Sequence, residues 1–144
     1  MSKQYWFFGT KLTVLADADQ TESNFDLIQG NFPPGSRSPM HVHTRYSETF
    51  YVLEGEAILI ANGQQHLLKA GECYTVPKNV EHAVINNSDH AELKALVVAS
   101  ASGFAKLINT AGIVVTGGEI SPPREHDMAL VGQAFEEAGD RIIM

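Results

Sequence analysis

Residues 35–55 read GSRSPMHVHTRYSETFYVLEG, and this stretch contains most of the residues that decide the predicted fold. His41 and His43 stand one residue apart, so both imidazoles point to the same side if they lie in a β-strand. Glu48 opens the next apolar strand and shares a face with Phe50. The pattern therefore predicts two histidines and a carboxylate that face one apolar interior.

A carboxylate on such a face is costly to bury unless a positive charge accompanies it, and no Lys or Arg has the matching parity on its strand. His82, in the turn-and-strand segment 71–86, offers a further imidazole. Three imidazoles and one carboxylate suit iron, manganese, nickel, copper or zinc, and match calcium or magnesium poorly. We therefore expect one divalent transition metal ion, held by His41, His43, Glu48 and His82.

Short β-prone runs with Gly, Pro or Asn turns between them fill the chain before Ser100. The runs are 11–16, 25–29, 49–53, 57–61, 65–68, 73–76, 82–86 and 92–99. The second run is expected to end near Gly30, and Asn62-Gly63 is a strong hairpin signal because both residues tolerate positive φ. This spacing predicts an antiparallel sandwich or barrel.

Beyond Ser100 the apolar period becomes helical. The periodic residues are Phe104, Leu107, Ile108 and Ala111 in one segment, and Met128, Val131 and Phe135 in the next. Gly139 is the expected end of the second helix, and Ser121-Pro122-Pro123 is expected to open it. We interpret residues 101–144 as a helical tail packed on the outside of the barrel; the alternative is a lid over its mouth.

The two glycine-bounded segments, 35–55 and 71–86, resemble the two signature motifs of the cupin family. The matching residues are Gly35, His41, His43, Glu48 and Gly55 in the first, and Gly71, Pro77, His82 and Asn86 in the second. The resemblance implies an all-β double-stranded β-helix, the cupin jelly-roll barrel, over residues 1–100. It also implies a metal ion in the barrel, bound by His41, His43, Glu48 and His82. One departure is Asn79 where the family has Gly, and Asn tolerates the left-handed region that this turn requires.

The chain is loosely similar to quercetin-dioxygenase-like cupins, which implies a metal-dependent dioxygenase acting on a small aromatic or enolisable substrate. Glu48 would then act catalytically as a proton acceptor. The expected metal is iron, manganese or nickel in preference to copper or zinc. Phe50, Val52 and Val84 are expected to line the cavity. The alternatives are a metal-dependent isomerase or lyase, favoured by a pocket rich in Arg and Lys, and a non-enzymatic binding module. Metal affinity should fall as the pH drops through about 6.5, the usual pKa of histidine.

Several residues outside the four expected ligands could also contribute to the site or to its surroundings. Tyr46 is expected at the barrel rim, with the metal cavity as the alternative. Arg37 and Arg45 could hold an anionic substrate group, or could be solvated loop charges. Cys73 is interpreted as a small buried hydrophobic residue. The histidines without matching spacing are expected to be solvated: His66, His90 and His126.

Composition limits the partners. The net charge is −7 and the basic residues are scattered, so neither nucleic acid nor an anionic membrane surface is expected. A single cysteine excludes an intramolecular disulfide and suits a reducing, cytoplasmic setting. Residues 1–8 match neither a signal peptide nor a membrane span. The family resemblance implies a homodimer, in which residues 5–8 either cross to a partner sheet or pair within their own barrel.

Overall fold

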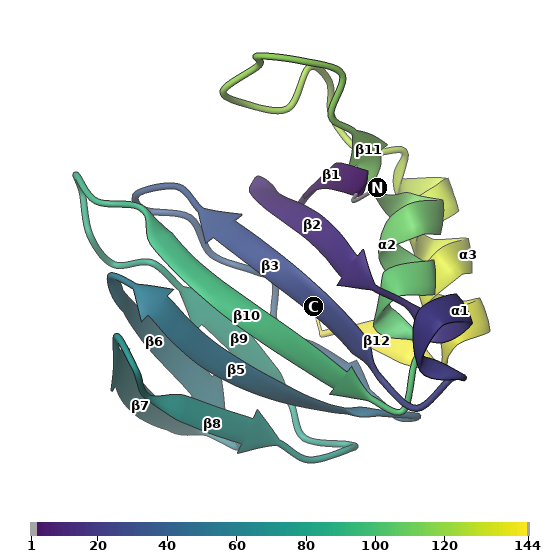
Figure 1. Cartoon of the computed structure of the whole chain (residues 1–144), viewed down its shortest axis with the longest axis horizontal. Helices are drawn as coiled ribbons and strands as arrows, with labels where there is room; N and C mark the ends of the chain where they lie inside the picture. Colours follow the sequence, from purple (N-terminus) through teal and green to yellow (C-terminus); the bar gives the residue numbers. More distant parts are fainter. Residues whose placement is uncertain (1–2, 144) are drawn as a thin grey trace.

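Two antiparallel sheets make up most of the computed structural model, which describes residues 3–143 (Figure 1). The seven-stranded sheet contains, in spatial order, β11 (Ile113–Val114), β1 (Lys3–Phe7), β2 (Thr10–Ala16), β3 (Asp26–Phe32), β10 (Leu93–Ser100), β5 (Ser47–Glu54) and β8 (Cys73–Val76). The five-stranded sheet contains β12 (Asp140–Ile142), β4 (His41–His43), β9 (His82–Ile85), β6 (Glu56–Ala61) and β7 (Gln64–Lys69). This arrangement confirms the predicted all-β jelly-roll fold. The ends of the predicted barrel and tail, residues 1–2 and 144, lie outside the described residues.

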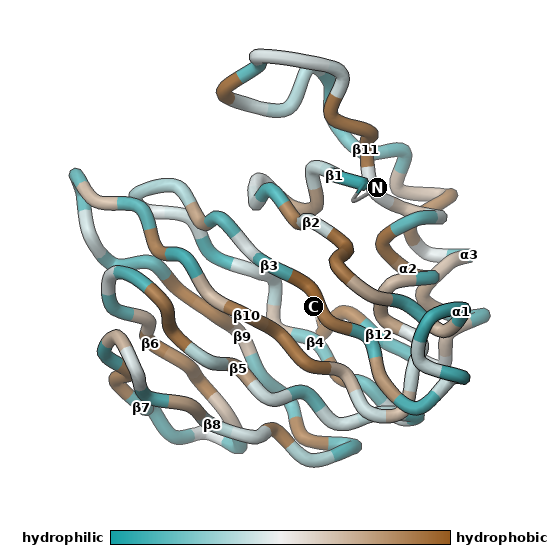
Figure 2. Tube along the Cα trace, viewed as in Figure 1, coloured by the Kyte–Doolittle hydropathy of each residue, from teal (hydrophilic) through white to brown (hydrophobic). Residues whose placement is uncertain are grey.

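The core lies between the sheets because the strands alternate in burial. In β3 and in β10, every second residue is buried, from Asp26 to Phe32 and from Leu93 to Ala99. Alternation with a period of two turns one face of each strand toward the opposite sheet. Hydrophobic residues follow the strands, whereas many turns are hydrophilic (Figure 2).

Two asparagines confirm the predicted turn chemistry. Asn62 and Gly63 have φ of 53° and 76°, as a two-residue hairpin between β6 and β7 requires. Asn79, at the position where the family motif has glycine, has φ of 67°. Its backbone N–H donates to the His43 carbonyl at 2.8 Å, so the turn before β9 is attached to β4.

The prediction that one strand ends near Gly30 is wrong, because β3 continues to Phe32. A Cβ atom at Gly30 would lie 2.6 Å from Cε1 of Phe32. The missing side chain therefore leaves room for the Phe32 ring, which packs edge-on against Phe50. Glycine serves close packing here and does not end the strand.

The tail contains both predicted helices, α2 (Phe104–Ala111) and α3 (Met128–Ala138), which lie side by side beside the sheets (Figure 1). A short helix, α1 (Ala18–Thr21), follows β2. The prediction that residues 121–123 open the second helix is wrong. Asp127 caps α3 instead, because its carboxylate accepts from the N–H groups of Ala129 and Leu130.

The tail also contributes strands that the sequence did not predict. β12 pairs with β4, and β11 pairs with β1. Both edges of β1 are therefore occupied within the chain, by β2 and by β11. Of the two interpretations of residues 5–8, pairing within their own barrel is the one observed. No helix in the range 3–143 has the length and apolar character needed to span a membrane.

Candidate metal centre

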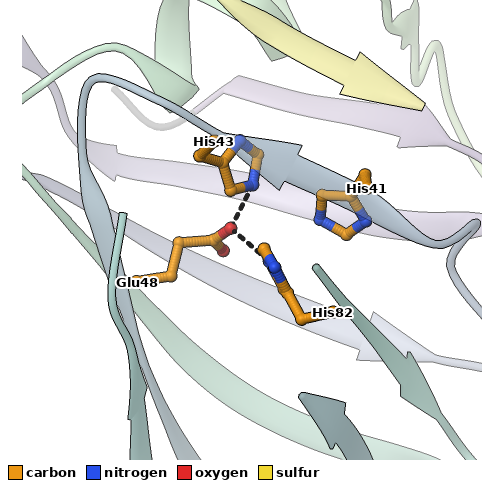
Figure 3. Close-up of side chains that lie close together, drawn as sticks. All are labelled: His41, His43, Glu48 and His82. Carbon is orange, nitrogen blue, oxygen red and sulfur yellow. Dashed lines mark hydrogen bonds and ion pairs between the residues drawn. The ribbon is translucent and has the colours of Figure 1, made fainter. Parts of the chain in front are cut away.

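Three strands, two from one sheet and one from the other, bring the four predicted ligands together (Figure 3). His41 and His43 come from β4, Glu48 from β5 and His82 from the first position of β9. One potential ligand atom from each residue lies within 4.8 Å of those of the other three. His41 and His82 face each other directly across the β4–β9 pair, and their ring centroids are 4.2 Å apart.

The backbone orients two of the imidazoles. Nδ1 of His41 lies 2.7 Å from the Pro39 carbonyl oxygen, and Nδ1 of His82 lies 2.9 Å from the Val80 carbonyl oxygen. In each case the carbonyl belongs to the residue two positions earlier. A protonated Nδ1 held this way leaves Nε2 as the free ligand nitrogen.

Glu48 and His43 form a buried ion pair. Glu48 Oε1 contacts Nε2 of His43 and lies 3.1 Å from Nε2 of His82. Burial alone would raise the pKa of Glu48, but the charge of His43 outweighs burial and holds it well below its usual value. Burial likewise opposes the charge on His43, but the carboxylates of Glu48 and Asp140 raise its pKa to about 9. The pair is therefore charged in the metal-free protein.

His41 has the opposite electrostatic behaviour. Burial, reinforced by the neighbouring His82 and His43, lowers its pKa to about 3. His41 is therefore neutral at physiological pH and has a free lone pair. Neutral imidazole and ionised carboxylate are the forms that bind metal ions.

The four side chains fit a divalent ion. They provide three imidazole nitrogens and one carboxylate, with their potential ligand atoms close together. Glu48 has no Lys or Arg partner in the described part of the chain, so only histidines neutralise it there. The mixed nitrogen and oxygen donors match borderline transition metals.

A cavity of about 70 Å³ opens beside the four residues. Its lining is dominated by six phenylalanines, which are Phe7, Phe8, Phe32, Phe50, Phe104 and Phe135. Among residues 3–143, no Lys or Arg lines it. The predicted wall residues Phe50 and Val84 are present, whereas Val52 does not line the cavity and is buried in the core.

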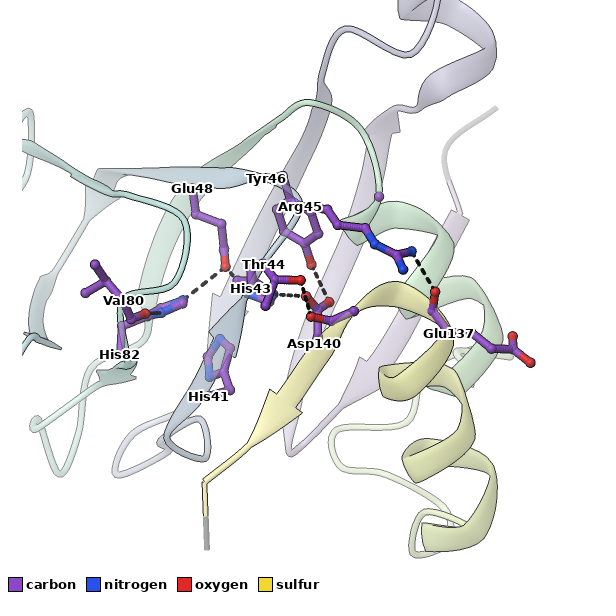
Figure 4. A network of polar contacts seen from close by, with 12 residues as sticks. His41, His43, Thr44, Arg45, Tyr46, Glu48, Val80, His82, Glu137 and Asp140 are labelled. Atoms are coloured by element: carbon purple, nitrogen blue, oxygen red, sulfur yellow. Dashed lines mark hydrogen bonds and ion pairs between the residues drawn. The ribbon is translucent and has the colours of Figure 1, made fainter.

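Tyr46 lies neither at the rim nor in the cavity. It is 1% exposed, and its ring stacks on His43 with the centroids 4.5 Å apart. Its hydroxyl donates to Asp140 at 2.9 Å (Figure 4). Burial raises the pKa of Tyr46 well above its usual value, so the hydroxyl stays protonated as a donor.

Other predicted candidates lie away from the centre. Arg37 and Arg45 are exposed and do not line the cavity, which agrees with solvated loop charges. Cys73 is exposed, which corrects the prediction that it is buried: its side chain is on the outer side of β8. His90 is exposed as expected.

Two histidines expected to be solvated are partly buried instead. His66 in β7 packs on Tyr74 of β8, a strand of the other sheet, with the ring centroids 4.3 Å apart. His126 accepts the Phe8 backbone N–H at 3.0 Å and packs against two of the cavity phenylalanines, Phe7 and Phe8. Burial lowers the pKa of His126. The burial of these two histidines is not predictable from local sequence, because the residues that cover them come from other strands or from distant segments.

The predicted site residues do not include Asp140, which follows the predicted helix end at Gly139. Asp140 is buried behind His43, on the opposite side of the ring from Glu48 (Figure 4). No motif marks it, because its proximity to His43 arises only when β12 pairs with β4.

Comparison with known proteins agrees with this geometry. A cupin domain model matches residues 29–99, a segment that contains the four clustered side chains. The crystal structure of a predicted oxalate decarboxylase from Thermotoga maritima superposes with a TM-score of 0.64 at 21% identity, over 70% of this chain and 92% of the other. Residues 29–99 therefore form a cupin domain, and its cluster is compatible with a divalent metal ion.

The similarity to two curated relatives covers different shares of this chain and only part of each relative. Quercetin 2,3-dioxygenase of Bacillus subtilis is 29% identical over 85 residues, which cover 59% of this chain and 25% of that enzyme. Nectarin-1 of Nicotiana langsdorffii x Nicotiana sanderae is 31% identical over 139 residues, which cover 90% of this chain and 57% of nectarin-1. The chain thus spans between a quarter and somewhat over half of these two relatives.

Proposed function

We propose that the protein is a metal-dependent dioxygenase whose substrate is a small, largely apolar molecule with an enol or phenol hydroxyl group. The observation that carries the proposal is a cavity lined by phenylalanines, with His41, His43, Glu48 and His82 at one side. An apolar pocket with a few convergent polar groups is typical of small-molecule sites. The similarity to the Bacillus subtilis dioxygenase supports the reaction type.

In this proposal the histidines and Glu48 hold one divalent ion, and iron, manganese and nickel are favoured. The ion would supply Lewis acidity that lowers the pKa of the substrate hydroxyl group, together with redox chemistry toward dioxygen. Glu48 is ionised in the free protein and accepts the hydroxyl proton on a carboxylate oxygen. Both atoms of dioxygen enter the products, so no external electron donor is required.

The phenylalanine rings hold the body of the substrate and exclude water. The cavity, about 70 Å³, is small beside ligand pockets of roughly 300–1,000 Å³. Compact diketones and catechols are therefore favoured over flavonols as substrates. The absence of Lys and Arg from the described lining gives no support to an isomerase or lyase of polar, anionic metabolites.

Oxygen uptake tests the function. Protein loaded separately with Fe²⁺, Mn²⁺ and Ni²⁺ is supplied with diketones, catechols and flavonols, and substrate-dependent uptake is expected with the compact compounds. His41→Ala should abolish uptake, whereas His90→Ala, the same change at an exposed histidine, should preserve it. No uptake with any compound would contradict the proposal, and retention of one ligand per chain without turnover would favour a binding module.

The predicted homodimer and cytoplasmic location belong to the same proposal. The single cysteine, exposed and unpaired, suits a reducing compartment. Sedimentation of the purified protein tests the homodimer, and a monomer at micromolar concentration would contradict it.

A further inference from the structure

The C-terminal strand β12 places a carboxylate directly behind one of the three histidines. Asp140 is paired in register with His43, and its Oδ1 lies 3.2 Å from Nδ1 of that ring (Figure 4). The Asp140 side chain is 0% exposed and that of His43 is 3% exposed. Burying a carboxylate this deeply is costly unless polar or charged partners offset the loss of its hydration. His43 is one of these partners.

His43 differs in this respect from the other two histidines. Nδ1 of His41 and Nδ1 of His82 each face a neutral backbone carbonyl, from Pro39 and Val80. Nδ1 of His43 faces a charged side chain from the opposite end of the chain. The His43–Asp140 contact is an ion pair whose 3.2 Å separation exceeds the 2.7 Å and 2.9 Å of the two carbonyl contacts. It differs from them in the charge of the acceptor, and hydrogen bonds to an ionised acceptor are the stronger kind.

The contacts around Asp140 hold it in place. The Tyr46 hydroxyl donates to Oδ2 at 2.9 Å and so occupies the second carboxylate oxygen. Thr44 Oγ1 donates to the Gly139 carbonyl at 2.5 Å, and Arg45 Nη1 donates to the Glu137 carbonyl at 2.8 Å. The segment that follows β4 therefore fixes the backbone before Asp140, and rotation of the carboxylate would break the hydrogen bond from Tyr46.

We propose that Asp140 is a positioning residue of the metal centre, which accepts the Nδ1 proton of His43 and so directs Nε2 of that ring toward the ion. The negative charge also makes Nε2 of His43 a more basic ligand. The C-terminal tail is then part of the metal centre, although the two motifs that supply the ligands end at residue 86. The proposal rests on metal binding by the cluster and not on the dioxygenase reaction.

Metal affinity tests the proposal through Asp140→Asn. The substitution keeps the size of the side chain but removes its charge, and it can turn an N–H group toward Nδ1. Zn²⁺ affinity, measured by competition with a coloured chelator, should fall about 10- to 100-fold. Glu125→Gln makes the same carboxylate-to-amide change at an exposed position of the tail and should leave the affinity unchanged. Unchanged affinity in a folded Asp140→Asn variant would overturn the proposal.

A measurement on the unaltered protein covers the case in which Asp140→Asn fails to fold. In Zn²⁺-loaded protein with ¹⁵N-labelled histidine, the Nδ1 proton of His43 should resonate farther downfield than those of His41 and His82. The other two histidines serve as internal references because their acceptors are neutral carbonyls. Three similar resonances would overturn the role of Asp140.

The two proposals can be separated experimentally. Weakened Zn²⁺ binding by Asp140→Asn, together with no oxygen uptake by the unaltered protein, supports the positioning role and contradicts only the dioxygenase. Unaltered protein that binds no Zn²⁺ contradicts both.

Discussion

At the scale of single residues, His41 and His43 lie on one strand and yet have different charge states. Glu48 and Asp140 lie on the two sides of His43 and raise its pKa to about 9, whereas burial lowers the pKa of His41 to about 3. The cause is the distribution of the carboxylates, because both lie against the same ring. One ligand is therefore ready to bind at neutral pH, and another must first lose a proton.

Metal binding should therefore release a proton at neutral pH. At pH 7.5 we expect about one proton per Zn²⁺ ion, because His43 is protonated in the free protein and must be neutral to bind. Calorimetry in buffers of different ionisation enthalpy measures this number. At pH values below the His43 pKa of about 9, metal affinity should fall about tenfold for each unit by which the pH is lowered. This decrease begins well above pH 6.5, the value expected from the sequence. Binding without proton release at pH 7.5 would contradict the charge state of His43.

At the scale of elements, the lack of a side chain has a different effect at the glycine in β3 and at the glycine in α3. Gly30 leaves space that the Phe32 ring fills at the cavity wall. Gly132 is exposed within α3, and a Cβ there would meet no atom within 4 Å. The first glycine is therefore required by packing, whereas the second only makes the unfolded chain more flexible.

The same substitution should consequently change stability in opposite directions. Gly30→Ala should lower the free energy of unfolding by about 1–3 kcal/mol, because the Phe32 ring must move. Gly132→Ala should raise it by about 0.5–1 kcal/mol. Urea denaturation measures both, and a Gly30→Ala variant as stable as the unaltered protein would show that Phe32 can move at no cost.

At the scale of the whole molecule, the cluster joins the two sheets. Glu48 belongs to the seven-stranded sheet, whereas the three histidines belong to the five-stranded sheet. An ion bound by all four would connect strands of both layers. Since a ligand that binds only the folded state stabilises it, bound metal should raise the melting temperature.

The melting temperature of metal-free protein should be highest near pH 6.5. Below this pH the unfolded state protonates His41 while the folded state, with a pKa of about 3, does not, so stability falls as the pH drops. Above it, the unfolded state loses the His43 proton that the folded state retains up to about pH 9, so stability falls as the pH rises.

Metal loading should remove the alkaline decrease, because the bound ion replaces the His43 proton. A chelator should restore the decrease and lower the melting temperature by several degrees. Scanning calorimetry from pH 4 to pH 9, with and without chelator, measures both effects. Identical curves in the two conditions would show that the cluster holds no ion.

The sequence alone determined most of the strands before Ser100 and the four clustered side chains, because alternation, turn residues and motif spacing are set by neighbours along the backbone. His41 and His43 share a face for any strand through them, and Asn79 enters the left-handed turn by its own conformational preference. Only the tertiary structure placed Asp140 behind His43, Tyr46 in contact with both, and His126 against Phe8. These contacts join residues that are far apart in the sequence. Which distant segments pack together depends on the sum of many weak interactions, and a local sequence pattern does not contain that information.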